Sequence, residues 1–323
     1  MSALLEVRNL SAVFPTRAGD VAAVRDLSYQ LGAGASLAIV GESGSGKSVG
    51  ALSLLGLVPA PGKVVGGEVF FEGRDLLGMS EKQWRKIRGR DIAMVFQDPM
   101  TSLNPVLTIG YQLMEALRWH RGAGNREARR QVTETLALVG IPDAERRLDD
   151  FPHQFSGGQR QRIMLAMAIA CRPSLLIADE PTTALDVTIQ AQIVELIAEL
   201  RHRLDMAVLW ITHDLALIAS VVDEVAVMYA GTIVEHGPVA AIFGKPRHPY
   251  TIGLLRSMPR FDAAREHRLT AIEGMPPDLA RLPRGCAFAP RCSRVVERCR
   301  AARPALDAPG QSHRVACWRA DGE

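Results

Sequence analysis

The chain has 323 residues, of which 47% are hydrophobic and 23% charged, a composition that is ordinary for a folded globular protein and excludes general disorder. Its net charge of +3 is too small to indicate nucleic acid as a partner. The longest apolar run, Ile163 to Cys171, has nine residues, well short of the ~20 that a membrane span needs. The first twenty residues lack the basic segment and apolar run of a secretion signal, so none is expected.

The first part of the chain predicts a strand, a glycine-rich loop and a helix. Residues 4–40 have the pattern of strands and turns, and the apolar run 36–40 ends at Gly41. A helix is expected over residues 46–58. The loop between them matches the phosphate-binding pattern G-x-x-x-x-G-K-[ST] with Gly41, Glu42, Ser43, Gly44, Ser45, Gly46, Lys47 and Ser48. We expect its backbone N–H groups to face the phosphates of ATP, Lys47 to reach the β- and γ-phosphates, and Ser48 to bind Mg²⁺.

The middle of the chain predicts a helical insertion in an α/β core. Residues 91–97 read as a strand, and about 104–155 have apolar residues at helical intervals with charges between them. Strand and helix patterns then alternate over 175–179, 188–203, 207–212 and 225–231. Such alternation favours a mainly parallel sheet covered by helices on both faces.

Two carboxylates end the predicted strand 175–179. Asp179 at the end of the strand is placed to hold a Mg²⁺ shell, as in a Walker-B strand. Glu180 follows it, and strand alternation would turn it away from Asp179, toward an attacking water that it could orient or deprotonate. By itself, the pair is also compatible with a solvated acidic loop after a buried strand.

A second glycine-containing helix start precedes that strand. Ser156, Gly157, Gly158 and Gln159 begin the apolar helix that runs to Cys171. Ser156 and Gln159 fit an S-x-x-Q capping box, and the two glycines leave backbone N–H groups bare for an anion. A helix cap without a ligand is the plainer interpretation of the same residues.

This Ser-Gly-Gly-Gln segment resembles the signature sequence of ABC ATPases, which binds the γ-phosphate of ATP held by an opposite subunit. The resemblance implies a P-loop NTPase core, residues 1–240, with a helical subdomain at about 98–160. Further positions match in order: Gln97 the Q-loop that senses Mg²⁺ and contacts the permease, Ala184-Leu185-Asp186 the D-loop, and His213 the switch histidine. Phe14, 27 residues before Gly41, is placed like the adenine-stacking aromatic, although a core residue on a strand face would look the same.

Several stretches resemble more narrowly the first of the two ATPase subunits of peptide/nickel importers. They are residues 41–59, the run Gln97-Asp98-Pro99-Met100-Thr101-Ser102-Leu103-Asn104-Pro105, and His248-Pro249-Tyr250-Thr251 before the tail. The resemblance implies two transmembrane permease subunits, a second ATPase subunit, an extracytoplasmic solute-binding protein, and a place on the cytoplasmic face of a bacterial-type inner membrane. Oligopeptides or dipeptides are the expected cargo, with nickel, glutathione or another small solute as alternatives. A soluble ABC ATPase acting on ribosomes or DNA, and a non-catalytic regulatory subunit, are remote alternatives.

The C-terminal extension, residues 241–323, is arginine-rich and holds Cys286, Cys292, Cys299 and Cys317. Five, six and seventeen residues separate these cysteines, and the C-x₂₋₄-C knuckle of structural zinc sites is absent. A four-thiolate [4Fe–4S] cluster tolerates such spacings, and the importer ATPases that the tail resembles can carry one. We therefore expect an iron–sulfur cluster, with zinc or no metal as alternatives.

Overall fold

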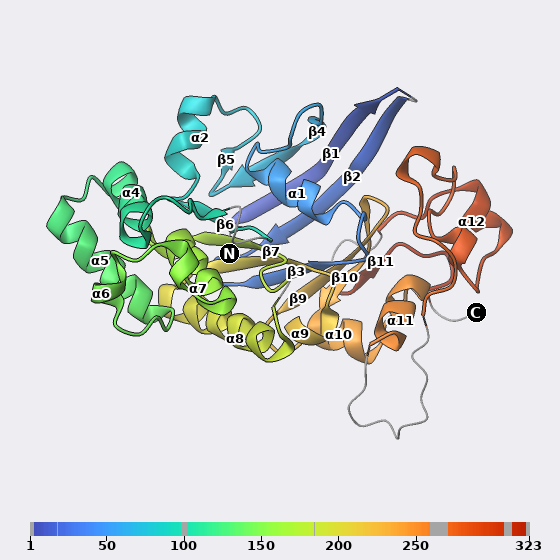
Figure 1. Ribbon diagram of the computed structural model, residues 1–323. Coiled ribbons are helices and arrows are strands. Elements are labelled where there is room, and N and C mark those ends of the chain that lie inside the picture. The colour runs from blue at the N-terminus through green and yellow to red at the C-terminus, as the bar shows by residue number, and fades with distance from the viewer. Residues whose placement is uncertain are drawn as a thin grey trace, which may run out of the picture. The chain divides into compact units, whose positions relative to one another are not determined.

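The computed structural model describes residues 3–17, 19–97, 102–183, 185–258, 271–306 and 312–320 (Figure 1). The chain divides into two compact units. The first comprises Gly32–Ser36 and Gly78–Trp210, and the second comprises Ser2–Leu31, Leu37–Leu77 and Ile211–Glu323. Within the described part of the chain, no helix combines the length and apolar character needed to span a bilayer.

The first unit combines parallel strands with most of the long helices. β6 (Ile92–Val95) pairs in parallel with β7 (Leu175–Asp179), and Ile92 lies opposite Leu175. β8 (Ala207–Thr212) begins in this unit. All five residues of β7 are buried, as expected for a parallel strand covered on both faces. The helices are α2 (Glu81–Ile87), α4 (Ile109–Arg121), α5 (Asn125–Leu138), α6 (Ala144–Arg147), η1 (Pro152–Gln154), α7 (Gly157–Ile169) and α8 (Val187–Leu204).

The expected helical insertion is present as α4 to α7. Leu117, Val132, Leu136 and Val139, which the sequence placed at helical intervals, are all at most 1% exposed. Met114, expected on the same face, is only half-buried. The apolar face of α4 and α5 therefore forms a core within the insertion itself.

The second unit holds two sheets. In the antiparallel sheet the strand order is β2-β1-β4-β5, and in the other sheet β11, β10, β9 and β3 follow one another. β3 runs parallel to β9, whereas β10 is antiparallel to both of its neighbours, β9 and β11. The strands are β1 (Leu5–Thr16), β2 (Gly19–Leu31), β3 (Ser36–Val40), β4 (Lys63–Phe71), β5 (Arg74–Asp75), β9 (Glu224–Tyr229), β10 (Thr232–Pro238) and β11 (Arg314–Val315). The helices are α1 (Lys47–Leu54), α9 (Leu215–Ile218), α10 (Val239–Gly244), α11 (Pro249–Arg256), η2 (Leu279–Arg281), η3 (Ala289–Arg291) and α12 (Glu297–Ala301).

The helix expected over 46–58 and the strand expected over 225–231 both end earlier than predicted, because residues with positive φ turn the chain. The helix expected over 46–58 is α1 and stops at Leu54, because Gly56 takes a left-handed φ of 60° and Leu57 N–H then bonds back to Leu52 O. This is the Schellman end of a helix. The strand expected over 225–231 stops at Tyr229, since Ala230 and Gly231 both have positive φ and turn the chain into β10.

A buried carboxylate fastens the start of α11 and the tail to β10. Glu235 has no exposed surface, and it accepts hydrogen bonds from Arg247 N–H (2.7 Å) and His248 N–H (3.0 Å) and from the His313 ring (2.7 Å). These partners offset the cost of burying the acid. His248 is itself buried, which lowers its pKa to about 3, and its Nδ1 accepts from Tyr250 N–H at the start of α11.

Candidate functional site

The phosphate-type loop joins buried β3 to α1, as the sequence predicts. At two of its glycines it passes so close to other backbone that a Cβ is excluded. A Cβ at Gly41 would lie 2.2 Å from Met228 O, and one at Gly46, whose φ is 98°, would lie 2.1 Å from Ala23 O. Gly44 also has positive φ. Between them, Ser43 is exposed and Ser45 is buried. The loop geometry therefore requires the glycines where the pattern has them.

Lys47 is folded into this loop. Its side chain is buried, and Nζ donates to Gly41 O (2.7 Å) and Glu42 O (3.0 Å). Lys47 is also the first residue of α1, with Ser48 next, so both lie at the positive end of the helix. An ammonium held by two backbone carbonyls beside a helix N-terminus is suited to neutralising an anionic phosphate chain.

Asp179 and Glu180 end β7 differently from the sequence prediction. Asp179 is buried as the last strand residue. Glu180 leaves the strand with a left-handed φ of 46°, so a backbone turn, not strand alternation, sets its direction. Its Oε2 accepts from Thr183 Oγ1 (2.9 Å) and from Gln97 Nε2 (3.4 Å). The structure thus brings together Gln97 and Glu180, which are 83 residues apart.

The Ser-Gly-Gly-Gln segment is a helix cap of the predicted kind. Ser156 Oγ accepts from Gln159 N–H (3.3 Å), and Gln159 Oε1 accepts from Ser156 N–H (3.1 Å). A Cβ at Gly157 would lie 3.8 Å from the Leu185 side chain, and one at Gly158 would crowd Ile189 at 3.1 Å. The first turn of α7 contains no acidic residue. Its N-terminus therefore keeps the bare, positive character that an anion requires.

The remaining predicted positions are placed as follows. Asp186 is the exposed N-cap residue of α8, while Ala184 lies outside the described residues, as do Asp98, Pro99, Met100 and Thr101 of the extended Q-loop. His213 is exposed directly after β8. Phe14 lies on β1, half-buried, with its ring against Gly62, where a Cβ would come within 2.5 Å. Gln97, Asp179, Glu180, Ser156 to Gln159 and Asp186 belong to the first unit; Phe14, Gly41 to Ser48 and His213 belong to the second.

Comparison with known proteins agrees with this geometry. Residues 24–183 match the ABC transporter family, and residues 234–299 match the C-terminal region of oligopeptide/dipeptide transporters. The oligopeptide transport ATP-binding protein OppD of Bacillus subtilis is 51% identical over 98% of this chain and 88% of its own. The dipeptide transport ATP-binding protein DppD of the same organism is 52% identical over 99% of this chain and 96% of its own.

The chain is an ABC-type ATPase of the oligopeptide/dipeptide transporter family. Solved structures agree on the fold. The protein cbiO1 of Clostridium perfringens, part of an ABC transporter complex, is 26% identical, with a TM-score of 0.65 over 76% of this chain and 92% of its own. The cassette MJ0796, solved as a dimer in a post-hydrolysis state with ADP and Pi, is 26% identical, with a TM-score of 0.63 over 73% of this chain and 98% of its own.

The four tail cysteines of this ABC ATPase line one small cavity of about 10 Å³, together with His248, Phe288 and Trp318. Burial raises the pKa of the Cys286, Cys292 and Cys317 thiols. No carboxylate lines the cavity among the described residues, which leaves the four thiols and the His248 ring as possible donors. However, this volume is close to that of a single water, and no three His, Cys, Asp or Glu side chains in the described ranges are arranged to hold a metal ion. As they stand, the side chains do not fit a bound metal group.

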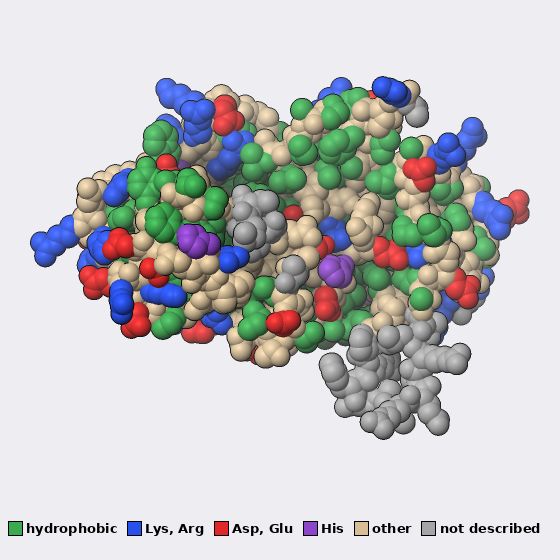
Figure 2. Space-filling view, viewed as in Figure 1, with side chains coloured by type: hydrophobic (Ala, Val, Ile, Leu, Met, Phe, Trp, Pro, Cys, Tyr) green, Lys and Arg blue, Asp and Glu red, His purple; other side chains and the backbone are tan. Residues whose placement is uncertain are grey.

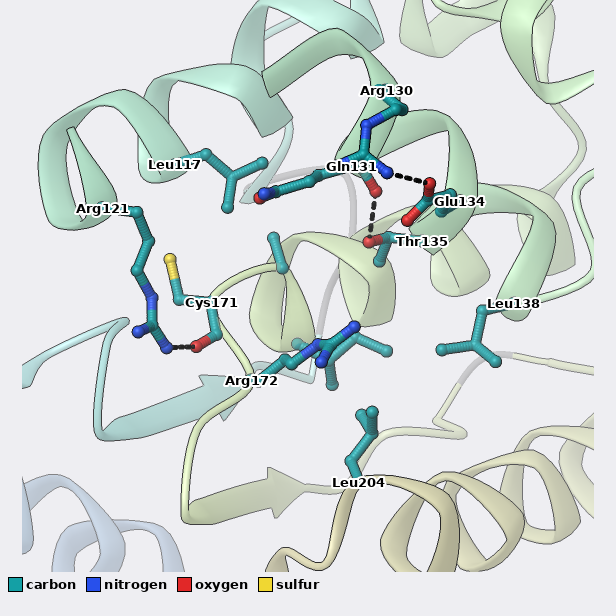
Figure 3. A pocket seen from close by; sticks show the side chains of 12 residues that line it. Leu117, Arg121, Arg130, Gln131, Glu134, Thr135, Leu138, Cys171, Arg172 and Leu204 are labelled. Carbon is teal, nitrogen blue, oxygen red and sulfur yellow. Dashed lines mark hydrogen bonds and ion pairs between the residues drawn. The ribbon is translucent and has the colours of Figure 1, made fainter. Parts of the chain in front are cut away.

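A larger cavity of about 570 Å³ opens among α4, α5, α7 and the end of α8 (Figure 3). Arg121, Arg130 and Arg172 line it, and Arg130 pairs with Glu134 at 3.0 Å. Cys171 lies at its edge with only 1% exposure and a pKa raised by burial, consistent with a small core residue. None of the predicted nucleotide-binding residues lines this cavity.

The sequence did not reveal how the tail contacts the phosphate-type loop. Arg291 forms a two-pronged ion pair with Glu42, at 2.6 Å and 3.0 Å, and Glu42 N–H donates to Tyr250 Oη at 2.8 Å. The rings of Tyr229, Tyr250 and Phe288 pack together with centroids 4.6 to 5.5 Å apart. Tyr250 belongs to the stretch His248-Pro249-Tyr250-Thr251 that resembles the importer ATPases, and this resemblance is a sequence signal for the region.

Proposed function

We propose that this ABC ATPase powers the import of oligopeptides or dipeptides through a separate membrane permease. The observation that carries the proposal is full-length similarity, since relatives named as oligopeptide and dipeptide transport ATP-binding proteins are 51–52% identical over 98–99% of the chain. The match of residues 234–299 to the C-terminal region of such transporters supports the same group. Nickel, glutathione or another small solute is the alternative cargo, because nothing in an ATPase subunit selects cargo directly.

In the proposed site, residues Gly41 to Ser48 wrap the phosphates of ATP and the Phe14 ring stacks on adenine. Ser48, Gln97 and Asp179 would hold Mg²⁺, which supplies charge neutralisation at the β- and γ-phosphates. Their oxygen-bearing side chains are the donor type that Mg²⁺ prefers, which supports the assignment.

Hydrolysis in this proposal is an in-line displacement by water. The water oxygen forms a bond to the γ-phosphorus, the bond to the bridging oxygen of ADP breaks, and Glu180 takes the water proton. Gln97 and Thr183, which bond to the Glu180 carboxylate, would orient it toward the water. His213 would hydrogen-bond the γ-phosphate as phosphate is formed.

A second ATPase subunit completes the site. Residues Ser156 to Gln159 would bind the γ-phosphate of ATP held by that partner, and Asp186 would lie at the contact between subunits. The bare N-terminus of α7 supports this role, because its N–H groups and lack of acidic residues suit an anion. Since the family-like stretches resemble one of two different importer ATPases, a heterodimer is proposed.

The permease would dock on the first unit. Large apolar side chains are exposed there at Phe96 (40%), Val106 (75%), Tyr111 (47%) and Trp119 (70%). Figure 2 shows hydrophobic side chains among charged ones over the α4–α5 part of the molecule. Apolar side chains that are exposed next to one another are typical of binding surfaces. Two permease subunits, reached from the cytoplasmic face of the inner membrane, and indirectly an extracytoplasmic solute-binding protein are the proposed partners, with no nucleic acid.

For the tail we propose a [4Fe–4S] cluster held by Cys286, Cys292, Cys299 and Cys317. Its support is that all four thiols line one cavity in which no described residue is a carboxylate. Arg294 and Arg319 line the same cavity and would offset the negative charge of a cluster. The thiols would have to turn and the cavity widen for this to occur. Zinc, or no metal, is the alternative.

Isolation of the tagged chain from gently solubilised membranes, followed by mass spectrometry, tests the proposed function. We expect two permease proteins and a second ATPase to co-purify, and labelled peptides to enter vesicles containing the complex only with ATP. Recovery of ribosomal proteins or DNA-processing factors would overturn the importer proposal in favour of a soluble ABC ATPase. Uptake of nickel or glutathione but not peptides would change the cargo alone.

A further inference from the structure

The carboxylate of Glu42 lies inside a loop whose other features favour anions. The loop offers glycine N–H groups, a helix N-terminus and the Lys47 ammonium, which already bonds to Glu42 O at 3.0 Å. The Glu42 carboxylate is one residue from Gly41. The Lys47 ammonium reaches back to this end of the loop, where it donates to Gly41 O and Glu42 O. If this carboxylate were free to rotate, it would repel the phosphates of ATP, because both carry negative charge. It would also compete with the phosphates for the positive charge of Lys47.

Arg291 removes this conflict in the structure. Its guanidinium holds both oxygens of Glu42, and it is only 5% exposed while the Glu42 side chain is 25% exposed. The position of Arg291 is fixed from its other side, since Nε donates to Glu273 O at 3.0 Å and Nη2 to Ile272 O at 3.3 Å. Tyr250 Oη, which accepts from Glu42 N–H, fixes the backbone of the same residue.

We propose that Arg291 is a positioning residue for nucleotide binding: it neutralises Glu42 and turns this carboxylate away from Lys47, so that the loop accepts phosphate. The C-terminal extension thereby sets the ATP affinity of the core. This role rests on the proposed binding of ATP at residues 41–48. Two-point geometry matters here, because a guanidinium matches both carboxylate oxygens, whereas an ammonium is a point charge.

The simpler role for Arg291 is to fasten the tail to the core, and the chain supplies a matched comparison. Arg303, from the same extension, pairs with Asp26 on β2 at 3.4 Å. Both side chains of this second pair are well exposed (39% and 63%), and Asp26 is not part of the loop. Arg303→Gln therefore breaks a tail-to-core ion pair without changing the charge beside Lys47.

Equilibrium binding of ADP with Mg²⁺ to the full chain tests the proposal, since ADP binds without turnover. We expect Arg291→Gln to raise the Kd about tenfold, the size of one like charge a few ångströms away that water partly screens. Adding Glu42→Gln to Arg291→Gln should bring the Kd to within about threefold of that of the Glu42→Gln single variant, because the effect of Arg291 depends on the Glu42 charge. Arg291→Lys should recover part of the loss, and Arg303→Gln should leave the Kd unchanged.

The rescue separates positioning from folding. If Arg291 only holds the tail, removing the Glu42 charge cannot restore binding, and failure of the double variant to recover would overturn the proposal. An unchanged Kd in Arg291→Gln would also overturn the proposal. An equal gain in affinity when Glu42→Gln is added to wild type and to Arg291→Gln would do the same. Thermal unfolding without nucleotide verifies that each variant is folded. If wild type itself fails to bind ADP, the proposed nucleotide site fails instead, which is a distinct outcome.

Discussion

The phosphate-type loop and the cysteine cavity, both in the second unit, differ in how their residues come together. Eight consecutive residues, Gly41 to Ser48, make the loop, and their glycines, helix start and lysine form one local structure. The cysteines come from positions 286 to 317 and share a cavity only through the folding of the extension. A site whose chemistry is carried by the backbone of a short segment is defined by its pattern, whereas a site assembled from distant side chains depends on their geometry.

The largest effect is expected from Glu180→Gln, which tests the catalytic residue that acts on nucleotide bound at the loop. It keeps the shape of the side chain but removes the carboxylate that takes the water proton, so turnover should fall by about 10²–10⁴-fold while ATP binding persists. Phosphate release by the assembled complex measures the first and nucleotide binding the second. Glu199→Gln, on exposed α8 surface, is the control. Turnover within about twofold of wild type would rule out Glu180 as the base.

Lys47→Ala tests the local nature of the loop. The variant loses the ammonium that lies between Gly41 O and Glu42 O, so we expect ATP affinity to fall by about 100-fold from loss of a charge-assisted contact with phosphate. Calorimetry or fluorescence titration gives the Kd. Lys82→Ala, an exposed residue of α2, should leave it unchanged. Normal affinity in Lys47→Ala would contradict the assignment of the loop.

Cys292→Ser sharpens the other half of the comparison. If the cavity holds a [4Fe–4S] cluster, wild type made without oxygen should be brown and contain about four irons per chain, and this variant should lose most of both. Metal analysis and absorption spectra measure the outcome, with Cys171→Ala in the first unit as the control. A colourless wild type would contradict the cluster, and its zinc content would then distinguish the zinc alternative from the alternative without a metal.

The smallest effect is a pH dependence of stability at His248. Its pKa is lowered to about 3 in the folded protein, whereas an unfolded chain takes up the proton near pH 6.5. The unfolded state therefore binds more protons between these values, so the contribution is complete above pH 6.5 and is lost as the pH falls. The free energy of unfolding should drop by up to ~1.4 kcal/mol per pH unit there.

Denaturant unfolding at pH 7 and pH 5 measures this dependence. His248→Asn keeps a side-chain acceptor for Tyr250 N–H but does not titrate, so its unfolding free energy should vary less between the two pH values. An equal dependence in both proteins would mean that other groups, such as the carboxylates, govern it.

Prediction from the sequence succeeded where the physical signal is local. Apolar runs gave β3, β7 and β8, and the Ser156–Gln159 pair gave the cap of α7. The prediction was less accurate at the ends of helices and strands. For example, a helical pattern of residues continues past Gly56, although the backbone turns there. The left-handed conformation of Glu180 has no sequence signal, since a non-glycine residue is held in it by its surroundings. Glu42 and Arg291 are 249 residues apart, and no periodicity connects them.

The short strand β11 has a consequence for how the extension can be studied. It pairs with β10 through Glu235 and His236, and Ala316 N–H donates to Val234 O at 2.8 Å. A truncation before residue 312 would remove these partners and leave β10 with open N–H and C=O groups, which recruit strands from other molecules. A shortened protein would then aggregate for reasons unrelated to cysteines or nucleotide. Point substitutions that keep this strand in place are therefore the sounder way to separate the roles of the tail.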